Sequence, residues 1–248
     1  MPNQRHNNIL RILAENNRTT VVELSDHLKV SSVTIRQDLT HLESEGLLKR
    51  VHGGAVLKDA DDLANRLGFN YEKKLRIARS VSRLVRDGET ILIESGSANA
   101  LLARELLKKR NITLVTTNVY IARQSRKIHQ SRVILAGGCY QQESETLVGK
   151  ITRDFLDQIN YDKAFVGIDG YTAATGFTHR DLHRAEIASH IIKRACDTFI
   201  ISDSTKFGRT ALTNICYPAD VQHIAADKDL GPEFRSEFEK SGIDLILA

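Results

Sequence analysis

The side chains with the most specific chemistry lie on one face of a helix that the sequence predicts from Ser31 onward. Ile35, Leu39 and Leu42 recur at helical spacing and must be buried together. The opposite face presents hydroxyls, a methyl-bearing side chain, a guanidinium and an amide, carried by Ser31, Ser32, Val33, Thr34, Arg36, Gln37 and Thr40. Groups of these types contact base edges and phosphates in the major groove of DNA.

A short basic ribbon follows this helix. Ser31 is suited to cap the helix start and Gly46 to end it, and residues 47–51 lead to a tip at His52-Gly53-Gly54. Lys49, Arg50 and His52 would contact the DNA backbone or the minor groove. The two glycines would let the backbone approach a partner closely.

A second set of small and polar residues follows the predicted strands of the C-terminal part. Its members are Glu94, Ser95, Gly96, Ser97, Asn99, Thr117, Asn118, Gly138, Asp169, Gly170 and Lys206. The carboxyl ends of parallel strands meet at one edge of a sheet, so these residues should converge there. Backbone amides and Lys206 would hold a phosphate, whereas Glu94, Asn118 and Asp169 would bind hydroxyls. The set predicts a site for a small anionic polyol.

Simpler explanations exist for each of these loops. Glycines and hydroxyl residues after strands also serve tight turns and helix caps. Lys206 beside Asp203 is compatible with an exposed ion pair. His179 and His183, four residues apart, fit a polar helix start better than a metal site. We predict no metal site, no cofactor and no catalytic residue.

The elements before residue 31 complete a recognisable N-terminal motif. Residues 5–16 place Ile9, Ile12 and Leu13 on one helix face. Thr20 and Glu23 have capping-box spacing at the start of a second helix, and a short turn then leads to residue 31. Three helices and a ribbon predict a winged helix-turn-helix. A small helical domain with a merely solvated polar face is the alternative.

The C-terminal part alternates between buried strands and amphipathic helices. Strands are predicted at 90–94, 112–116, 132–136, 163–167, 198–202, 223–226 and 245–247. Helices are predicted at 71–86, 98–109, 119–127, 146–159, 181–195 and 233–240. This alternation indicates a doubly wound, mostly parallel α/β sheet. The 71–86 helix carries a basic side that we interpret as solvated, made of Lys73, Lys74, Arg76, Arg79, Arg83 and Arg86.

Length and composition fit two modest domains without membrane segments. With 248 residues, 41% hydrophobic and 27% charged, we predict a DNA-binding domain at 1–57, a linker at 58–70 and an α/β domain at 71–248. The net charge of +4 permits nucleic-acid binding without requiring it. Three scattered cysteines and the lack of a signal peptide favour reduced thiols and a cytoplasmic location.

Several motifs of the N-terminal part occur together at fixed spacing. They are Glu23-Leu24, then Ser31-x-x-Thr34-Ile35-Arg36-Gln37-Asp38-Leu39, then Lys49-Arg50-Val51-His52-Gly53-Gly54-Ala55. Together they resemble the signature of the DeoR family of bacterial transcriptional regulators. The loops after the strands, including Gly167-x-Asp169-Gly170 and Asp203-Ser204-x-Lys206-Phe207-Gly208, resemble the family's sensor domain. Glu94 replaces an Asp that many members carry, a pattern similar to that of the YciT-like branch.

The resemblance implies a sensor domain with a fold similar to ribose-5-phosphate isomerase and CoA transferases. It also implies binding of a small phosphorylated metabolite that changes affinity for a double-stranded DNA operator. We expect a repressor of a carbohydrate-related operon, acting as a homo-oligomer, either dimer or tetramer, because one recognition helix reads only a short half-site. The alternative is a phosphosugar isomerase or deaminase with Asp169 or Glu94 as general base and Lys206 on phosphate.

Overall fold

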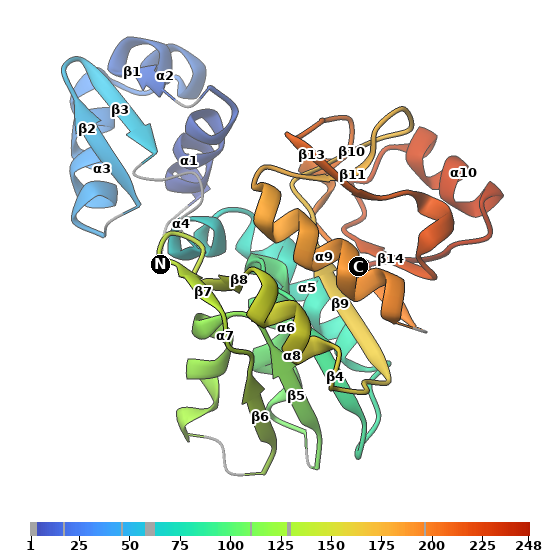
Figure 1. The fold of residues 1–248 in the computed structure, drawn as a ribbon. Helices are drawn as coiled ribbons and strands as arrows, with labels where there is room; N and C mark the ends of the chain where they lie inside the picture. Colours follow the sequence, from blue (N-terminus) through green and yellow to red (C-terminus); the bar gives the residue numbers. More distant parts are fainter. Residues whose placement is uncertain are drawn as a thin grey trace. The chain divides into compact units, whose positions relative to one another are not determined.

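A computed structural model describes residues 4–16, 18–45, 47–57, 63–109, 111–127, 130–195 and 197–248. The chain forms two compact units, Met1–Tyr71 and Glu72–Ala248 (Figure 1). Gly46, the first five residues of the predicted linker and Cys196 lie outside the described residues.

The N-terminal unit consists of three helices and a three-stranded antiparallel sheet. The helices are α1 (Gln4–Asn16), α2 (Val21–Leu28) and α3 (Ser32–Ser44). The strands are β1 (Arg18–Thr20), β2 (Leu48–Val51) and β3 (Gly54–Leu57), in the order β1-β3-β2. The winged helix-turn-helix prediction is confirmed. The strand β1 was not predicted, because three residues carry no usable periodicity.

Local capping fixes the boundaries of the helix-turn-helix. Thr20 and Glu23 form the predicted capping box at the start of α2, and the Ser31 hydroxyl accepts from the Thr34 amide at the start of α3. Lys29 adopts a left-handed conformation with φ of 52°, which makes the tight turn between the two helices. The predicted inward residues Ile9, Leu13, Ile35, Leu39 and Leu42 are fully buried in one core together with Leu24, and Ile12 is 6% exposed.

The two glycines of the ribbon have structural roles. Gly53 lies at the tip with φ of +74°, where other residues would be strained. A Cβ on Gly54 would lie 2.1 Å from the carbonyl oxygen of Thr19, so the strand pairing with β1 requires glycine there. Gly54 was expected to let the backbone approach a partner closely. In the structure it approaches strand β1 of the same unit.

Part of the predicted linker is helical. The short helix α4 (Leu63–Gly68) occupies residues that the sequence assigned to the linker, and Leu63 is buried. The apolar side chain of Leu63 can be removed from water, which favours an ordered helix. The sequence before it is mostly polar and charged.

The C-terminal unit is built on a seven-stranded parallel sheet. Its strands are β4 (Thr90–Ile93), β5 (Thr113–Thr116), β6 (Arg132–Leu135), β9 (Lys163–Gly167), β12 (Thr198–Ile201), β14 (His223–Ala226) and β15 (Asp244–Leu247). Their order is β15-β14-β12-β9-β4-β5-β6. The strand order reverses between β4 and β9, which makes this the topological switch point of the sheet.

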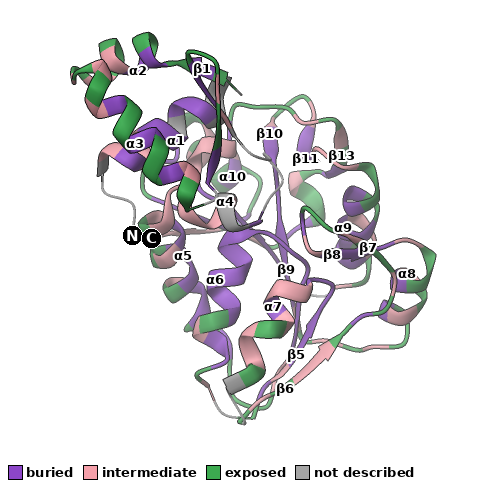
Figure 2. Cartoon of the chain, turned by 90° about the vertical axis from the view of Figure 1, so that its left-hand side faces the viewer, coloured by how far each residue is buried: buried purple, intermediate pink, exposed green. Residues whose placement is uncertain are grey.

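Helices cover both faces of this sheet, as a doubly wound fold requires. Figure 2 shows α5 (Tyr71–Ser82) and α6 (Ser97–Leu106) on one side, with α8 (Lys150–Leu156) and α9 (Leu182–Arg194) on the other. The remaining helices are α7 (Val119–Arg123), α10 (Pro232–Lys240) and the 3-10 turns η1 (Gln124–Lys127), η2 (Ser204–Lys206) and η3 (Pro218–Asp220).

Several helix predictions differ from the structure. The predicted helix at 71–86 ends at Ser82. The predicted helix at 146–159 begins instead with a strand, β8 (Thr146–Val148), which pairs with β7 (Cys139–Gln141). Gly149, with φ of 93°, separates this strand from α8. On α5, Lys74 was assigned to the solvated side but is only 4% exposed.

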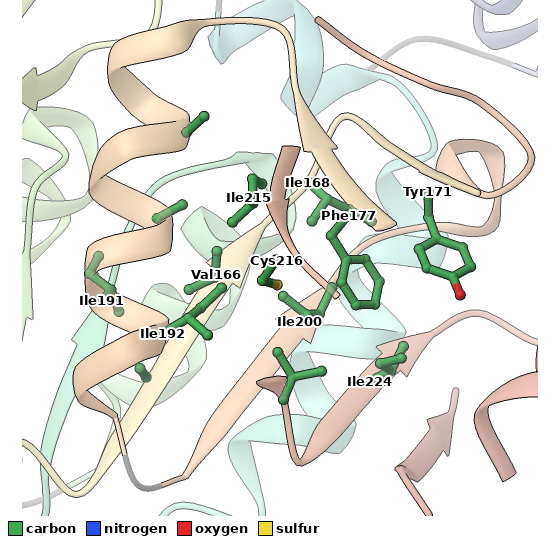
Figure 3. Close-up of a cluster of buried hydrophobic side chains, with 14 of the residues drawn as sticks. Val166, Ile168, Tyr171, Phe177, Ile191, Ile192, Ile200, Ile215, Cys216 and Ile224 are labelled. Atoms are coloured by element: carbon green, nitrogen blue, oxygen red, sulfur yellow. The ribbon is translucent and has the colours of Figure 1, made fainter. Parts of the chain in front are cut away.

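A small antiparallel sheet follows the end of β9 and was not predicted. It contains β10 (Gly170–Thr172), β11 (Gly176–His179) and β13 (Thr213–Cys216). Figure 3 shows Phe177 and Ile215 among the core side chains between α9 and the parallel sheet, with Ile192 and Ile200 nearby. Tyr171 lies beside Phe177, on the side away from α9. This packing fixes the loops at the carboxyl ends of β9 and β12.

Candidate functional sites

The outward face of α3 contains two classes of polar side chain. The side chains of Arg36 and Gln37 are exposed and make no hydrogen bond or ion pair with the part of the chain that is described. Ser31 and Thr34 are committed to the helix start, because the Ser31 hydroxyl accepts from the Thr34 amide and lies 2.9 Å from the Thr34 hydroxyl. Arg36 and Gln37 are thus the groups of α3 most available to a partner.

The outward face of α3 and the ribbon together form a shallow concavity of about 510 Å³. It is lined by Val33, Arg36, Gln37, Thr40, His41, Ser44 and Arg50. Val33 is 61% exposed, although an apolar side chain would normally be covered. The predicted residues of α3 therefore share one surface with a residue of the ribbon, and the sequence did not identify His41 and Ser44 as part of it.

The ribbon residues do not all point the same way. Arg50 lies against α3, where its Nη1 donates to the Thr40 hydroxyl at 2.8 Å and its backbone amide donates to Glu43 Oε1 at 2.8 Å. Lys49 and His52 are exposed and have no side-chain partner among the described residues. Side chains alternate along a strand, which places Lys49 and Arg50 on opposite faces of β2.

A buried carboxylate holds α3 against α1. Asp38 accepts from Arg5 Nε at 2.6 Å and from Arg5 Nη2 at 2.9 Å, and the Nε2 of His6 lies 3.0 Å away. Burial acts to raise the pKa of Asp38, but hydrogen bonds from Arg5 and His6 outweigh it, so the pKa lies below its usual value. Asp38 was not among the predicted site residues.

At the switch point, Glu94 is a fully buried carboxyl at the end of β4. The Ser95 hydroxyl donates to its Oε1 at 2.7 Å, whereas its Oε2 has no hydrogen-bond partner among the described residues. Burial raises the pKa of Glu94, and the Ser95 hydrogen bond and the charge of Arg184 offset this only in part. A buried acceptor of this kind suits a ligand that brings a hydrogen-bond donor.

The start of α6, beside Glu94, lacks a side-chain cap, which favours an anion there. Gly96 precedes the helix with φ of 107°, and no side chain caps the helix start. A Cβ on Gly96 would be 3.9 Å from the Cα of Gly167, so the two loops at the switch point run close together. Ser97 is buried in the first turn. Uncapped backbone amides at a helix start attract anionic groups.

Other predicted effector residues hold the loops together. Asn118 caps α7 by accepting from the Ile121 amide, and its Nδ2 donates to the carbonyl of Ser144 and to the Thr146 hydroxyl. The Thr117 hydroxyl donates to the carbonyl of Glu94 at 2.8 Å. The Nδ2 of Asn99 donates to two backbone carbonyls, but its buried Oδ1 has no partner in the described part of the chain.

The two remaining predicted glycines allow close packing. A Cβ on Gly138 would lie 2.0 Å from the Thr152 hydroxyl oxygen, and one on Gly170 would lie 2.5 Å from the carbonyl oxygen of Arg209. Both positions therefore require glycine for the fold itself.

A cluster of charged groups surrounds Asp169 after β9. Its Oδ2 lies 3.2 Å from His179 Nδ1 and 3.3 Å from Arg180 Nε. The Arg180 side chain is about one-third exposed, and the other two are buried. Asp181 caps α9 through the Arg184 amide at 2.8 Å, which confirms the polar helix start predicted around His179. Within the described residues, no three His, Cys, Asp or Glu side chains are arranged to hold a metal ion.

Arg184 is a candidate site residue that the sequence analysis did not identify. Its side chain is 1% exposed, and its charge acts to lower the pKa of the Glu94 carboxyl. Its Nε also lies 3.8 Å from Asp181 Oδ1. Arg184 shares the inward face of α9 with Ile187, Ala188 and Ile191. A cation on an apolar helix face is a signal that could have identified it.

In the loop after β12, Asp203 is not exposed, so the exposed ion pair with Lys206 that was the alternative to phosphate binding does not fit. Asp203 is buried, caps the turn η2 and lies 3.7 Å from Nζ of Lys74. Lys206 is half-buried at the end of the same turn. Nearby, Lys73 contacts Asp227 at 3.1 Å and Asp229 at 2.7 Å. Two lysines of α5, the first helix of the C-terminal unit, therefore attach it to the loop after β12 and to the loop after β14.

Comparisons with known proteins match both units. The family described as DeoR-like helix-turn-helix domain matches residues 5–61, and the DeoR C terminal sensor domain matches residues 69–228. The HTH-type transcriptional regulator GolR of Listeria innocua is 31% identical over 100% of this chain and 99% of its own length. The glycerol-3-phosphate regulon repressor of Escherichia coli K12 is 32% identical over 86% of this chain and 85% of its own length.

Similarity to solved structures is more distant. A ribose 5-phosphate isomerase A from Methanocaldococcus jannaschii aligns with a TM-score of 0.42 and 19% identity, over 56% of this chain and 55% of that one. An eIF2B beta subunit from Chaetomium thermophilum aligns with a TM-score of 0.49 and 13% identity, over 69% and 53%.

In the described residues, no helix combines the length and the apolar character needed to span a membrane. The exposed face of α3, the ribbon beside it and the α/β unit that follows are the parts of one known class of protein. Both family matches and two relatives above 30% identity agree. The chain belongs to the DeoR family of helix-turn-helix transcriptional regulators.

Proposed function

We propose that this regulator represses a carbohydrate-related operon by binding a double-stranded DNA operator. The observation that carries the proposal is the face of α3 on which the side chains of Arg36 and Gln37 are exposed and have no partner in the described chain. Arg36, Gln37, Ser32 and Val33 would enter the major groove. Lys49 and His52 would contact the DNA backbone or the minor groove. Relatives named as repressors support the sign of regulation.

A small phosphorylated metabolite would modulate this activity at the switch point of the C-terminal unit. The uncapped start of α6 at Gly96 would receive the anionic group. The unsatisfied Glu94 Oε2 and Asn99 Oδ1 would accept from hydroxyls. A relative named for glycerol 3-phosphate supports a phosphorylated ligand. Lys206, Asp169 and Gly170 border the same edge of the sheet.

The regulator would act as a homo-oligomer, a dimer or a tetramer. A single α3 reads only a few base pairs, whereas two copies related by symmetry read repeated half-sites. Analytical ultracentrifugation with and without half-site DNA tests this. A protein that stays monomeric and binds single half-sites tightly would contradict it. A cytoplasmic location is part of the same proposal, because the operator is there.

The enzyme alternative is less well supported. Asp169 and Glu94 are carboxylates near the switch point, but Asp169 is engaged by His179 and Arg180. The relatives are named as transcriptional regulators. We expect no turnover when the protein is incubated with a panel of phosphosugars.

Selection of genomic DNA fragments by the purified protein tests the proposal. We expect a few sites with related half-sites to be enriched at moderate salt. Glycerol 3-phosphate, with inorganic phosphate as the control, can then be tested for release of the selected DNA. Indiscriminate retention of fragments, or none, would contradict the assignment of α3 as a recognition helix.

A further inference from the structure

Thr40 and Arg50 form a connected pair between the recognition helix and the ribbon. The Thr40 hydroxyl donates to the carbonyl of Arg36 at 2.8 Å and accepts from Arg50 Nη1 at 2.8 Å. Its single proton is therefore used within the helix, and one of its acceptor positions is occupied by Arg50. Thr40 is poorly placed to donate to DNA, although it lies on the outward face of α3.

Two hydrogen bonds to α3 fix the position of Arg50, one through its backbone and one through its side chain. Its backbone amide donates to Glu43 Oε1 at 2.8 Å, which attaches the strand to α3, and its side chain is held by Thr40. Leu48 and Arg50 share one face of β2 by strand alternation, and the buried Leu48 packs in the core of this unit. The guanidinium is consequently held beside Thr40 of α3, where Arg50 lines the concavity and has further N–H groups that can donate.

We infer that Arg50 is a pre-positioned contact to a DNA phosphate beside the recognition helix, and that Thr40 is the positioning residue that holds it there. This inference rests on the DNA-binding role proposed for α3. Residues near the start of a recognition helix read base edges, and in this chain Arg36 and Gln37 occupy that part. Arg50 borders the later part, next to His41 and Ser44, and a guanidinium outside the base-reading part of the helix is suited to a phosphate.

Fixing the guanidinium in advance lowers the cost of binding. A free arginine side chain loses rotamer freedom when it is immobilised on a phosphate. In this structure Thr40 has already restricted Arg50 before any DNA is present. Removing the Thr40 hydroxyl should therefore weaken binding while the charge at residue 50 remains.

Salt-dependent binding to a short mixed-sequence duplex tests both roles with the full-length chain. We expect Arg50→Ala to reduce the slope of log affinity against log salt by about 0.9 per bound protomer. Affinity at low salt should fall about tenfold. Thr40→Val should lower affinity about threefold and leave the slope unchanged, whereas Thr40→Ser should behave like the wild type.

The double variant separates a positioning role from a direct contact. If Thr40 acts only through Arg50, Thr40→Val has no further effect in the Arg50→Ala background. The matched control is Lys49→Ala, which removes an equal charge from the opposite face of the same strand. Its effect should add to that of Thr40→Val. Circular dichroism of each variant establishes that the fold is retained.

Two results would overturn the inference. An unchanged salt slope in Arg50→Ala would show that Arg50 contacts no phosphate. A full Thr40→Val effect in the absence of Arg50 would show that Thr40 meets DNA itself. If the wild-type chain binds no duplex at low salt, the DNA-binding proposal fails instead, a result that is distinguishable from both.

Discussion

The Nζ of Lys74 lies 3.7 Å from Oδ2 of Asp203, and both side chains are almost completely buried. Burial acts to raise the pKa of Asp203, but the charge of Lys74 and the hydrogen bonds from Thr205 outweigh it, so the pKa is lowered. Lys74 follows directly after the boundary between the two units, and Asp203 begins the loop that contains Lys206. The pair thus joins the first helix of the C-terminal unit to a loop of the proposed effector site.

Replacing Lys74 should destabilise the C-terminal unit strongly. Lys74→Met leaves the Asp203 carboxylate buried without its cation, which costs about 3–5 kcal/mol of unfolding free energy. Urea unfolding monitored by circular dichroism measures this. Arg79→Met, an exposed cation on the same helix, is the control and should change stability by about 0.5 kcal/mol or less.

The pH dependence of this effect has a definite sign. Because the folded pKa of Asp203 is lowered, its contribution is present above the unfolded pKa and is lost as the pH falls through the folded value. The difference between wild type and Lys74→Met should therefore shrink in acid. A difference that grows in acid would contradict the assignment of the pair.

The Asp38 contacts predict how the recognition helix is held. Asp38→Asn keeps the shape of the side chain but removes the negative charge that both Arg5 and His6 contact. We expect a loss of about 1–3 kcal/mol in the unfolding free energy of the N-terminal unit, with weaker DNA binding as a consequence. Hydrogen exchange of the α3 amides would report the loosening directly. Unchanged protection would mean that apolar packing alone holds α3 in place.

The main architecture could be predicted because its signals are local. All seven strands of the parallel sheet are apolar runs, and each is confirmed within about two residues. The capping residues Thr20, Ser31 and Asp181 act on amides three residues away, so the sequence indicates them directly. Helical spacing likewise identified the buried apolar residues of α3, Ile35, Leu39 and Leu42.

The features that were missed depend on contacts between distant residues. The strand β11 pairs with β13 across more than thirty residues, from Thr178 to Asn214 for example. The buried cations Lys74 and Arg184 share helix faces with Ile77 and Ile187, yet their partners come from other elements. The hydrogen bond from Arg50 to the Thr40 hydroxyl could not be predicted, because the two residues lie ten apart on different elements. Periodicity indicates which face a residue is on but not what meets it there.

Arg36 and Lys49 should affect DNA binding in different ways. Arg36→Ala should cost about 1–3 kcal/mol toward a selected operator and relax its sequence preference. Binding to mixed-sequence DNA should change much less. Lys49→Ala should weaken both kinds of DNA by a similar factor and lower the salt slope. Equal losses on both DNAs for Arg36→Ala, measured by fluorescence anisotropy, would contradict a base-reading role.

Glu94 should lower the free energy of unfolding at neutral pH, because its carboxyl is buried. Its pKa is raised by burial, so its contribution is full below the unfolded value of 4.5 and is lost as the pH rises through the folded value. Glu94→Gln mimics the neutral form and should raise the unfolding free energy at pH 7 by about 1 kcal/mol.

The Glu94→Gln variant should also lose the pH dependence above 4.5 that this carboxyl causes, whereas Glu72→Gln, at an exposed carboxylate, should alter neither quantity. Release of selected DNA by glycerol 3-phosphate should weaken in Glu94→Gln if the carboxyl accepts from the ligand's hydroxyls. A variant that is less stable at pH 7 than the wild type would show instead that an ionised Glu94 supports the fold through Arg184. In that case the switch point would be held by a structural ion pair, and its ligand would have to bind without displacing Glu94.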